Sequence, residues 1–302
     1  MTESRSLGVV VNNKQNFSLV SFDTGLQELS KAATELLQVI KDVTGFVLEP
    51  AAIRRTAKAN RDARILEAKT DVEVARIRAQ VLDSLSAEEV IKYCNASSIL
   101  LNAASKVSES APVRNIDPDW LLLFVDKAKL ITDVQMQELW ARVLAGEAAV
   151  PGSFSKRTVE FLRTLNADDA RAFSLACRFA PLLDGEPWLF VYYDNIGFYK
   201  EHDLEFWMLS HLDDIGLIRF DYLGGGFTAR IETVHAGLVY GGSKYEMRFP
   251  VKFSGELSVG SAILTRSGRE LHRLVEHQAV DGFCEYVFGR WKRQCIDVTR
   301  VD

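Results

Sequence analysis

Cysteine and long apolar runs are both scarce in this chain of 302 residues. Its four cysteines lie far apart and form no CxxC pair, which argues against a disulfide framework and a structural zinc site. The longest apolar runs, such as residues 120–125 and 188–193, are much shorter than the about 20 residues that a transmembrane helix needs. The N-terminus lacks the apolar core of a signal peptide. We therefore expect a cytoplasmic protein without a membrane span.

Positive charge is also limited. The formal net charge is −5, which argues against nucleic acid binding by bulk charge but is compatible with a local basic stripe. Apolar residues make up 47% of the chain and charged residues 25%, as in an ordinary globular protein, so a collagen-like or wholly disordered chain is excluded. A chain of this length predicts two or three compact units.

The common catalytic signatures are missing as well. Neither Gly-Lys-Ser nor Gly-Lys-Thr occurs, so there is no Walker phosphate loop, and there is no GxSxG nucleophile elbow. His272 and Glu276 have helical spacing, but three residues separate them where an inverted zincin motif has two. The sequence therefore indicates no cofactor, no metal site and no catalytic residue, and an enzyme is the less favoured interpretation.

A short N-terminal arm is expected over residues 1–22, and a long helical, coiled-coil-like region over residues 23–106. The first helix of this region opens at Thr24, because Gln27 follows at the spacing of a capping box. Apolar residues then recur every three or four positions as far as Val43. This heptad spacing is typical of a helix that packs along a seam, and Gly45 marks its expected end.

A second, much longer helix is expected after Pro50, because no further proline or glycine occurs through Lys92. It carries an apolar stripe from Ile65 to Leu82, and the two helices together predict a coiled-coil-like hairpin. The first helix is too short to cover this stripe, so we expect a second copy of the chain to cover it and predict a homo-oligomer. The residues expected to hold the oligomer are Leu29, Leu36, Ile40, Ile65, Val72 and Leu82.

The first half of the long helix carries a basic run between residues 54 and 64. One interpretation is a footprint for phosphate or for an anionic membrane surface. The other, which we favour, is a solvated helix end with salt bridges to a partner chain, because residues 67–73 are mixed and then acidic. No aromatic residue is interleaved with these cations, so they offer no stacking platform for bases. The basic residues are Arg54, Arg55, Lys58, Arg61 and Arg64.

A polar segment with two prolines, residues 105–119, predicts a linker into a helical bundle over residues 113–181. Four amphipathic helices with short loops are expected in the bundle, with Trp140 in their core. Asn166 and Asp169 have the spacing of a capping box for the fourth helix.

Aromatics and glycines become dense over residues 182–302, and the apolar period falls towards two, so we expect an α+β domain there. A helix ending at Gly216 precedes a short strand, and another short strand precedes a helix over residues 267–277. The glycines at 224–226 predict a hairpin turn, and Pro250 places an alternating strand at a sheet edge. This order resembles an elaborated winged helix.

Many winged helices bind DNA, whereas others only contact another protein. The acidic pair Asp213 and Asp214 beside the expected turn favours protein contacts. Arg269 and Arg273 are four residues apart on the last helix and share one face, which keeps nucleic acid binding open as the alternative. The sequence thus predicts a mainly α chain with a C-terminal α+β part, made of a long coiled-coil-like helical hairpin, a small helical bundle and a winged-helix-like domain.

Three segments resemble a known family. The string MQELWARVLAGEAAVPGSFSKRTVEFLRTL at residues 136–165 is similar to the helical core of the abortive-infection alpha (Abi-alpha) proteins and their uncharacterised bacterial relatives. LEPAAIRRTAKANRDARILEA at residues 48–68 is similar to the start of their long helix, and VGSAILTRSGRELHRLV at residues 259–275 to their C-terminal strand and helix. Within the first string, residues 151–155 are interpreted as a turn that feeds a helix cap.

The resemblance implies a helical intracellular protein that acts as an effector in defence against bacteriophage. It carries over no catalytic residue. Combined with the predicted oligomer, it favours a non-enzymatic, self-assembling effector or scaffold, with a second protein encoded nearby as a further partner. The alternative is a nucleic acid-binding protein that uses the C-terminal domain.

Overall fold

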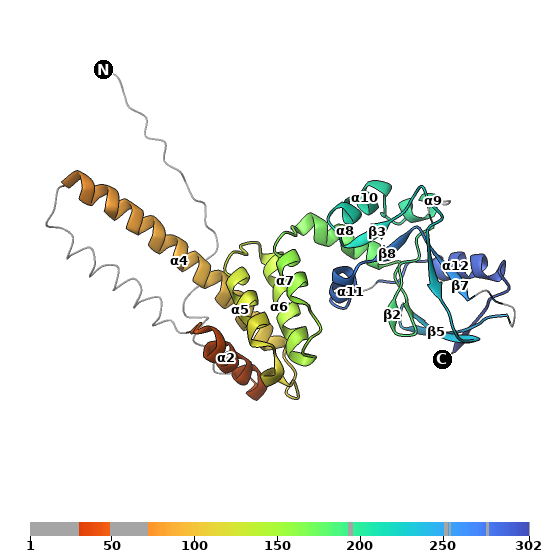
Figure 1. Ribbon diagram of the computed structural model, residues 1–302, viewed down its shortest axis with the longest axis horizontal. Helices are drawn as coiled ribbons and strands as arrows, with labels where there is room; N and C mark the ends of the chain where they lie inside the picture. Colours follow the sequence, from red (N-terminus) through yellow and green to blue (C-terminus); the bar gives the residue numbers. More distant parts are fainter. Residues whose placement is uncertain are drawn as a thin grey trace, which may run out of the picture.

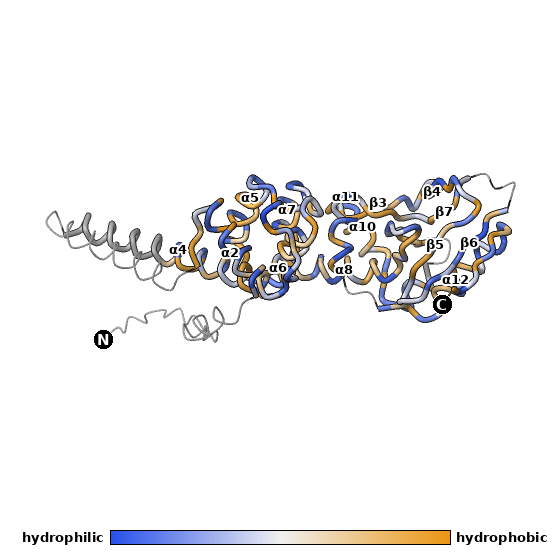
Figure 2. Tube along the Cα trace, turned by 90° about the horizontal axis from the view of Figure 1, so that it is seen from below, coloured by the Kyte–Doolittle hydropathy of each residue, from blue (hydrophilic) through white to orange (hydrophobic). Residues whose placement is uncertain are grey.

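The computed structural model describes residues 30–48, 72–192, 196–250, 253, 255–275 and 278–301, and for residues 72–86 and 196 it describes the backbone alone. The described chain forms an N-terminal helical unit followed by a C-terminal α+β unit (Figure 1). Figure 2 shows the two units end to end along the long axis, with α8 (Ala167–Cys177) and α11 (Arg266–His272) near their junction.

The helical unit begins with α2 and ends with α7. The oxygen of Ser30 caps the start of α2, and Gly45, with φ of 69°, ends that helix as predicted. The expected start at Thr24 lies outside the described residues. The elements of the unit are α2 (Lys31–Thr44), α4 (Val72–Lys106), the short 3-10 helix η1 (Val113–Asn115), α5 (Pro118–Ala128), α6 (Val134–Ala149) and α7 (Lys156–Leu162).

The core of this unit lies between α2, α5, α6 and the C-terminal half of α4. Leu36 and Ile40 of α2 are buried there, together with Ile99 of α4. Trp140 of α6 is fully buried, and its ring centroid lies 5.1 Å from that of Phe124 on α5. The expectation that Trp140 belongs to the core is confirmed.

The predicted coiled-coil-like hairpin is wrong. α2 has only 14 residues and contacts α5 and η1 as well as α4. Its heptad seam is therefore covered by several short helices of the same chain rather than by one long neighbour. A spacing of three and four specifies an apolar helix face, but it does not specify what covers that face.

The C-terminal unit confirms an α+β part, but its strands make the mainly α prediction wrong. The described residues of this unit form nine strands. Its helices besides α8 and α11 are α9 (Ile196–Lys200), α10 (Phe206–Asp214) and α12 (Phe283–Lys292). Its strands are β1 (Leu182–Leu183), β2 (Glu186–Pro187), β3 (Ile218–Phe220), β4 (Phe227–Arg230), β5 (His235–Tyr240), β6 (Ser243–Arg248), β7 (Glu256–Gly260), β8 (Ala262–Leu264) and β9 (Asp297–Val301).

Five of these strands form one antiparallel sheet in the order β2-β1-β5-β6-β9. One tight hairpin of this sheet joins β5 to β6, where Tyr240 pairs with Ser243. Gly241 and Gly242 form the two-residue turn with φ of 56° and 80°, values that strongly favour glycine. Two smaller ladders pair β3 with β8 and β4 with β7.

Two further expectations about this unit are wrong. The glycines at 224–226 do not form a hairpin turn, because the strands on either side of them do not pair with each other: β3 pairs with β8, and β4 pairs with β7. β6 lies between β5 and β9 rather than at an edge, and Pro250 lies beyond its last residue, Arg248. The five-stranded sheet and α12 also make the unit larger than the predicted winged-helix-like domain, although β3 follows α10 and β8 precedes α11 as expected.

Candidate anion-binding groove

A groove of about 280 Å³ lies between α11 and the hairpin of β1 and β2. Arg269 and Arg273, the two C-terminal basic residues singled out from the sequence, both line it. The structure therefore brings this predicted pair together on one surface. The other lining residues are Leu182, Gly185, Glu186, Pro187, His272 and Val275.

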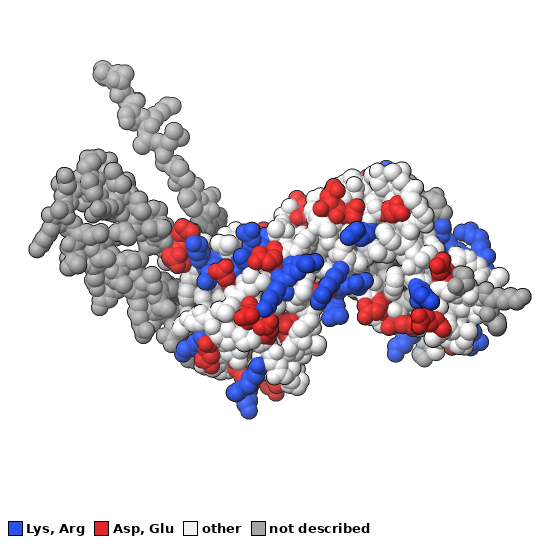
Figure 3. Space-filling view, in the orientation of Figure 1, with Lys and Arg blue, Asp and Glu red and all other residues white. Residues whose placement is uncertain are grey.

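The two arginines of the groove are exposed and lack acidic partners among the described residues. No carboxylate of the described chain lies within 4.0 Å of either guanidinium, whereas the neighbouring Arg266 bonds Glu270 at 3.0 Å. Figure 3 shows Lys and Arg side chains gathered over α7 and α11 in the middle of the face in view. Two unpaired guanidinium groups one helical turn apart can bind a phosphate or carboxylate through paired hydrogen bonds.

The position of α11 depends on the residues at its start. The hydroxyl of Thr265 accepts a hydrogen bond from the Gly268 N–H at 3.1 Å and donates to the Gly216 carbonyl at 2.8 Å. Gly268 lies very close to the backbone just before β3, because a Cβ atom there would come within 2.1 Å of the Leu217 carbonyl oxygen. Only glycine allows this approach, which sets the distance between the helix of the groove and the sheet.

A buried carboxylate ties α11 to the helical unit. Glu270 accepts hydrogen bonds from the N–H and the hydroxyl of Ser155, the residue that caps α7. Burial acts to raise the pKa of Glu270, but the hydrogen bonds from Thr158, Ser155 and Arg266 outweigh it and lower that pKa. Glu270 therefore stays ionised at neutral pH and is not a free acid of the groove.

A second buried carboxylate holds the other end of the same turn. Glu147 of α6 accepts hydrogen bonds from the N–H groups of Gly152 at 2.6 Å and Phe154 at 2.9 Å. Ser155 then accepts from the Thr158 N–H at 3.3 Å and begins α7. The interpretation of residues 151–155 as a turn that feeds a helix cap is confirmed.

The C-terminal end of α11 is fixed by a polar network that sequence reasoning missed. Arg142 of α6 donates to the Leu274 carbonyl at 3.0 Å and to Glu138 at 3.3 Å. Glu138 also binds Lys106 of α4 at 3.0 Å and Asn102. Burial acts to raise the pKa of Glu138, but the hydrogen bonds from Asn102, Lys106 and Arg142 lower it overall. The available signal was the adjacent polar pair Gln137 and Glu138 in the sequence of α6.

His272 lies at the base of the groove and is buried. Its Nε2 atom is 3.3 Å from the Ala180 carbonyl oxygen, so the ring faces the protein interior. Among the described residues, no group of three His, Cys, Asp or Glu side chains is arranged to hold a metal ion. The chemistry that the groove offers is therefore recognition by the two guanidinium groups.

The other predicted contact residues are placed differently. The basic residues Arg54, Arg55, Lys58, Arg61 and Arg64 lie outside the described residues. Of the predicted oligomer contacts, Leu36 and Ile40 are buried by the chain's own helices. Leu29 and Ile65 lie outside the described residues, and Val72 and Leu82 lie on α4 where only the backbone is described.

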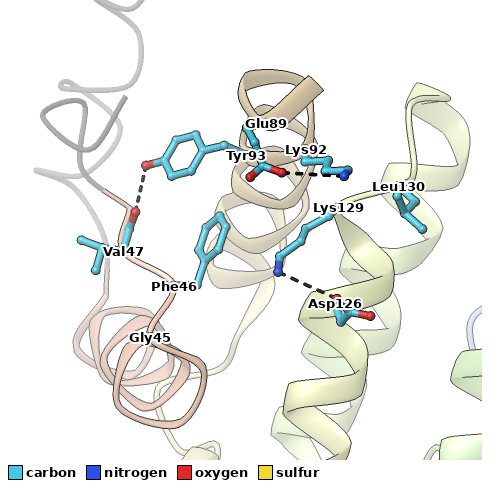
Figure 4. A pocket seen from close by; sticks show the side chains of 9 residues that line it. All are labelled: Gly45, Phe46, Val47, Glu89, Lys92, Tyr93, Asp126, Lys129 and Leu130. Carbon is cyan, nitrogen blue, oxygen red and sulfur yellow. Dashed lines mark hydrogen bonds and ion pairs between the residues drawn. The ribbon is translucent and has the colours of Figure 1, made fainter. Parts of the chain in front are cut away.

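A second pocket, of about 520 Å³, opens where the end of α2, the middle of α4 and the end of α5 meet (Figure 4). The rings of Phe46 and Tyr93 stack there with centroids 5.2 Å apart, and the Tyr93 hydroxyl donates to the Val47 carbonyl at 2.9 Å. Lys92 and Lys129 also line it. Lys92 forms an ion pair with Glu88 at 2.5 Å, and Lys129 forms one with Asp126 at 3.9 Å. Because both cations already have partners, this pocket is a weaker anion site than the α11 groove.

Comparison with known proteins places this chain in a family. No match was found among curated proteins or among solved structures. No described helix has the length and apolarity needed to cross a lipid bilayer. A family profile matches residues 85–288, which include the whole α11 groove and all of α6. Because this match spans about two thirds of the chain, the protein belongs to the family described as protein of unknown function (DUF2806).

Proposed function

We propose that this chain is a binding protein that holds one anionic group of a partner molecule, a phosphate or a carboxylate, in the α11 groove. The observation that carries the proposal is the pair of exposed guanidinium groups, Arg269 and Arg273, without acidic partners among the described residues. Charge-assisted hydrogen bonds to such anions are about twice as strong as neutral ones.

The hydrogen bonds that hold α11 in place favour a fixed binding site over a flexible charged surface. Glu270 anchors the middle of α11 to the turn before α7, and Arg142 holds the backbone just after it at Leu274. Guanidinium groups on an anchored helix lose less entropy on binding than the same groups on a mobile loop. A groove of about 280 Å³ also suits one small anionic group rather than the backbone of a duplex.

The proposal is tested by thermal unfolding of the full chain in sodium phosphate, in sodium acetate and in sodium chloride of equal ionic strength. A bound anion at ten times its Kd adds about 1.4 kcal/mol to the free energy of unfolding, so phosphate or acetate should raise the Tm above that in chloride. Arg269→Gln with Arg273→Gln should abolish that rise.

Arg293→Gln is the matched control, because Arg293 is exposed at the end of α12 and does not line the groove. Its Tm should respond to phosphate as the wild type does. Equal Tm rises in the double variant and the wild type would refute the proposal. Submicromolar, salt-dependent binding of duplex DNA that is lost in the double variant would favour the nucleic acid alternative instead.

A second candidate function is self-assembly, in the effector or scaffold role implied by the resemblance to Abi-alpha proteins. The observation that favours it is on α4, where Val90 is 38% exposed and Ile91 is 53% exposed. In Figure 1 the N-terminal half of α4 extends beyond the rest of the described helical unit. Adjacent exposed apolar side chains on such a helix are typical of a contact with another chain.

Val90→Glu with Ile91→Glu should dissociate the assembly, because it places carboxylates in an apolar contact. Analytical ultracentrifugation measures the change. Val150→Glu is the matched control, since Val150 is 62% exposed at the end of α6. A wild-type chain that is monomeric at tens of micromolar would refute self-assembly.

A further inference from the structure

Exposed apolar side chains gather at the start of α10 and in the loop after β3. Trp207 is 57% exposed and Leu223 is 85% exposed, although both are large and apolar. Phe206 and Tyr222 are exposed beside them, with ring centroids 5.2 Å apart. We call Phe206, Trp207, Tyr222 and Leu223 the aromatic surface. Clustered exposed side chains of this kind mark interaction sites more often than scattered ones do.

The aromatic surface is held in place rather than carried on a free loop. Asp221 accepts a hydrogen bond from the Gly224 N–H at 2.7 Å, which closes the turn that presents Tyr222 and Leu223. The Asp221 N–H donates to the Ser261 carbonyl at 2.8 Å and joins the turn to the neighbouring ladder. The backbone of this turn is therefore ordered before any partner binds, which lowers the entropy cost of binding.

The sequence next to the aromatic surface is rich in acidic residues. The sequence from Glu201 to Asp214 contains five acidic residues and no Lys or Arg. Glu205 directly precedes Phe206, and Asp221 directly precedes Tyr222. Figure 3 shows Asp and Glu side chains over α10. The acidic residues of this stretch and of the turn after β3 are Glu201, Asp203, Glu205, Asp213, Asp214 and Asp221, and no ion pair joins any of them to another described residue.

We propose that this acidic, aromatic surface binds the basic segment at residues 49–69 of a second copy of the chain, an inference that rests on the proposed self-assembly. That segment carries five cations between residues 54 and 64 and only Asp62 as an acid among them. Ile53 lies before the cations, and Ile65 and Leu66 lie after them, so apolar side chains are available at both ends. The two sequences are complementary in charge and both supply apolar anchors.

The charge of this surface favours the basic segment at residues 49–69 over a nucleic acid as its ligand. Phosphates would be repelled by the carboxylates of Glu205 and Asp221 next to Phe206 and Tyr222, which have no ion-pair partner in the described part of the chain, whereas arginines and lysines gain from them. Exposed Trp and Tyr side chains are also frequent energetic centres of protein interfaces, and arginine stacks well on their faces. Salt bridges to a partner chain are also the favoured interpretation of this basic run in the sequence, and the acidic residues next to this surface could form them.

The test uses a fluorescein-labelled peptide of residues 49–69 and fluorescence anisotropy. The receptor is the full chain with its five cations between residues 54 and 64 changed to Glu, so that its own segment does not compete. We expect saturable binding that weakens as salt is added. Trp207→Ala with Leu223→Ser in that receptor should weaken binding about tenfold or more, and Asp203→Asn with Glu205→Gln should weaken it and reduce the salt dependence.

Leu130→Ser is the matched control, because Leu130 is 49% exposed in the other unit and should leave peptide binding unchanged. A peptide with the five cations replaced by Glu should not bind. Absence of saturable binding, or equal binding to the Trp207→Ala, Leu223→Ser receptor, would overturn the proposal. If the wild-type chain still sediments as an oligomer in that case, self-assembly stands and this surface is not its contact.

Discussion

The carboxylate of Glu270 accepts a hydrogen bond from the Ser155 N–H at 2.7 Å and another from the Ser155 hydroxyl at 3.1 Å. The two residues are 115 positions apart and belong to different units of the fold. Ser155 caps α7 of the helical unit, and Glu270 directly follows Arg269 of the groove. One buried carboxylate therefore both completes a helix cap and fixes the helix that carries Arg269 and Arg273.

Glu270→Gln should lower the free energy of unfolding by about 1–3 kcal/mol, the usual effect of weakening hydrogen bonds to a buried charged group. Burial acts to raise the pKa of Glu270, but its hydrogen bonds lower it below the ordinary value of 4.5. The stabilisation is therefore complete above about pH 4.5 and is lost as the pH falls through the folded-state pKa. Urea unfolding of the wild type and of Glu270→Gln, at neutral pH and in acid, measures this effect. The difference between their free energies of unfolding should be smaller in acid.

Glu232→Gln is the control for this prediction, because the Glu232 side chain is 79% exposed and should affect stability little. A difference between wild type and Glu270→Gln that stays constant into acid would show that the carboxylate charge is not what binds the Ser155 turn.

Gly268→Ala should lower the free energy of unfolding by about 1–3 kcal/mol, as overpacking in a close contact does. The added Cβ would lie 2.1 Å from the Leu217 carbonyl oxygen, which is backbone and cannot rotate away. Gly289→Ala on α12 is the matched control, since its Cβ meets nothing within 4 Å and helix propensity then favours alanine. Thermal unfolding of both variants should give changes of opposite sign; a neutral Gly268→Ala would contradict the close packing of α11 on β3.

Local features of the fold could be predicted from the sequence because neighbouring residues determine them. Gly45 ends α2, and Asn166 with Asp169 forms the capping box of α8. Arg269 and Arg273 share one helix face, because positions four apart always do. Local geometry sets this shared face, whereas the β1 and β2 hairpin that completes the groove is distant in the sequence.

Long-range pairings could not be predicted, because no local pattern specifies a distant partner. The seam of Leu36 and Ile40 indicated an apolar face, but its cover came from several helices of the same chain. The alternation along β6 indicated a strand, but its pairing with β9 at the far end of the chain places it inside the sheet. The contact of Glu270 with Ser155 is of the same kind.

Trp140→Ala should lower the free energy of unfolding by about 3–5 kcal/mol, the usual range for truncating a large buried aromatic side chain. Trp140 is fully buried, and its ring packs against that of Phe124. Trp207→Ala is the matched control, because Trp207 is 57% exposed and its truncation removes little buried area. Chemical denaturation monitored by circular dichroism gives both values, and similar losses for the two variants would contradict the assignment of Trp140 to the core.

Tyr240→Phe should reduce the loss of stability in alkali. The Tyr240 hydroxyl donates to the Arg178 carbonyl at 2.9 Å and accepts from the Val280 N–H at 2.7 Å. Burial raises the pKa of Tyr240 from 10.0 to about 12. The unfolded chain therefore releases this proton first, so the stability contributed by the neutral phenol is present below pH 10 and falls as the pH rises towards 12. Urea unfolding across this range should show a shallower decline for Tyr240→Phe than for the wild type or for Tyr222→Phe at an exposed tyrosine; equal declines in all three would refute the role of Tyr240.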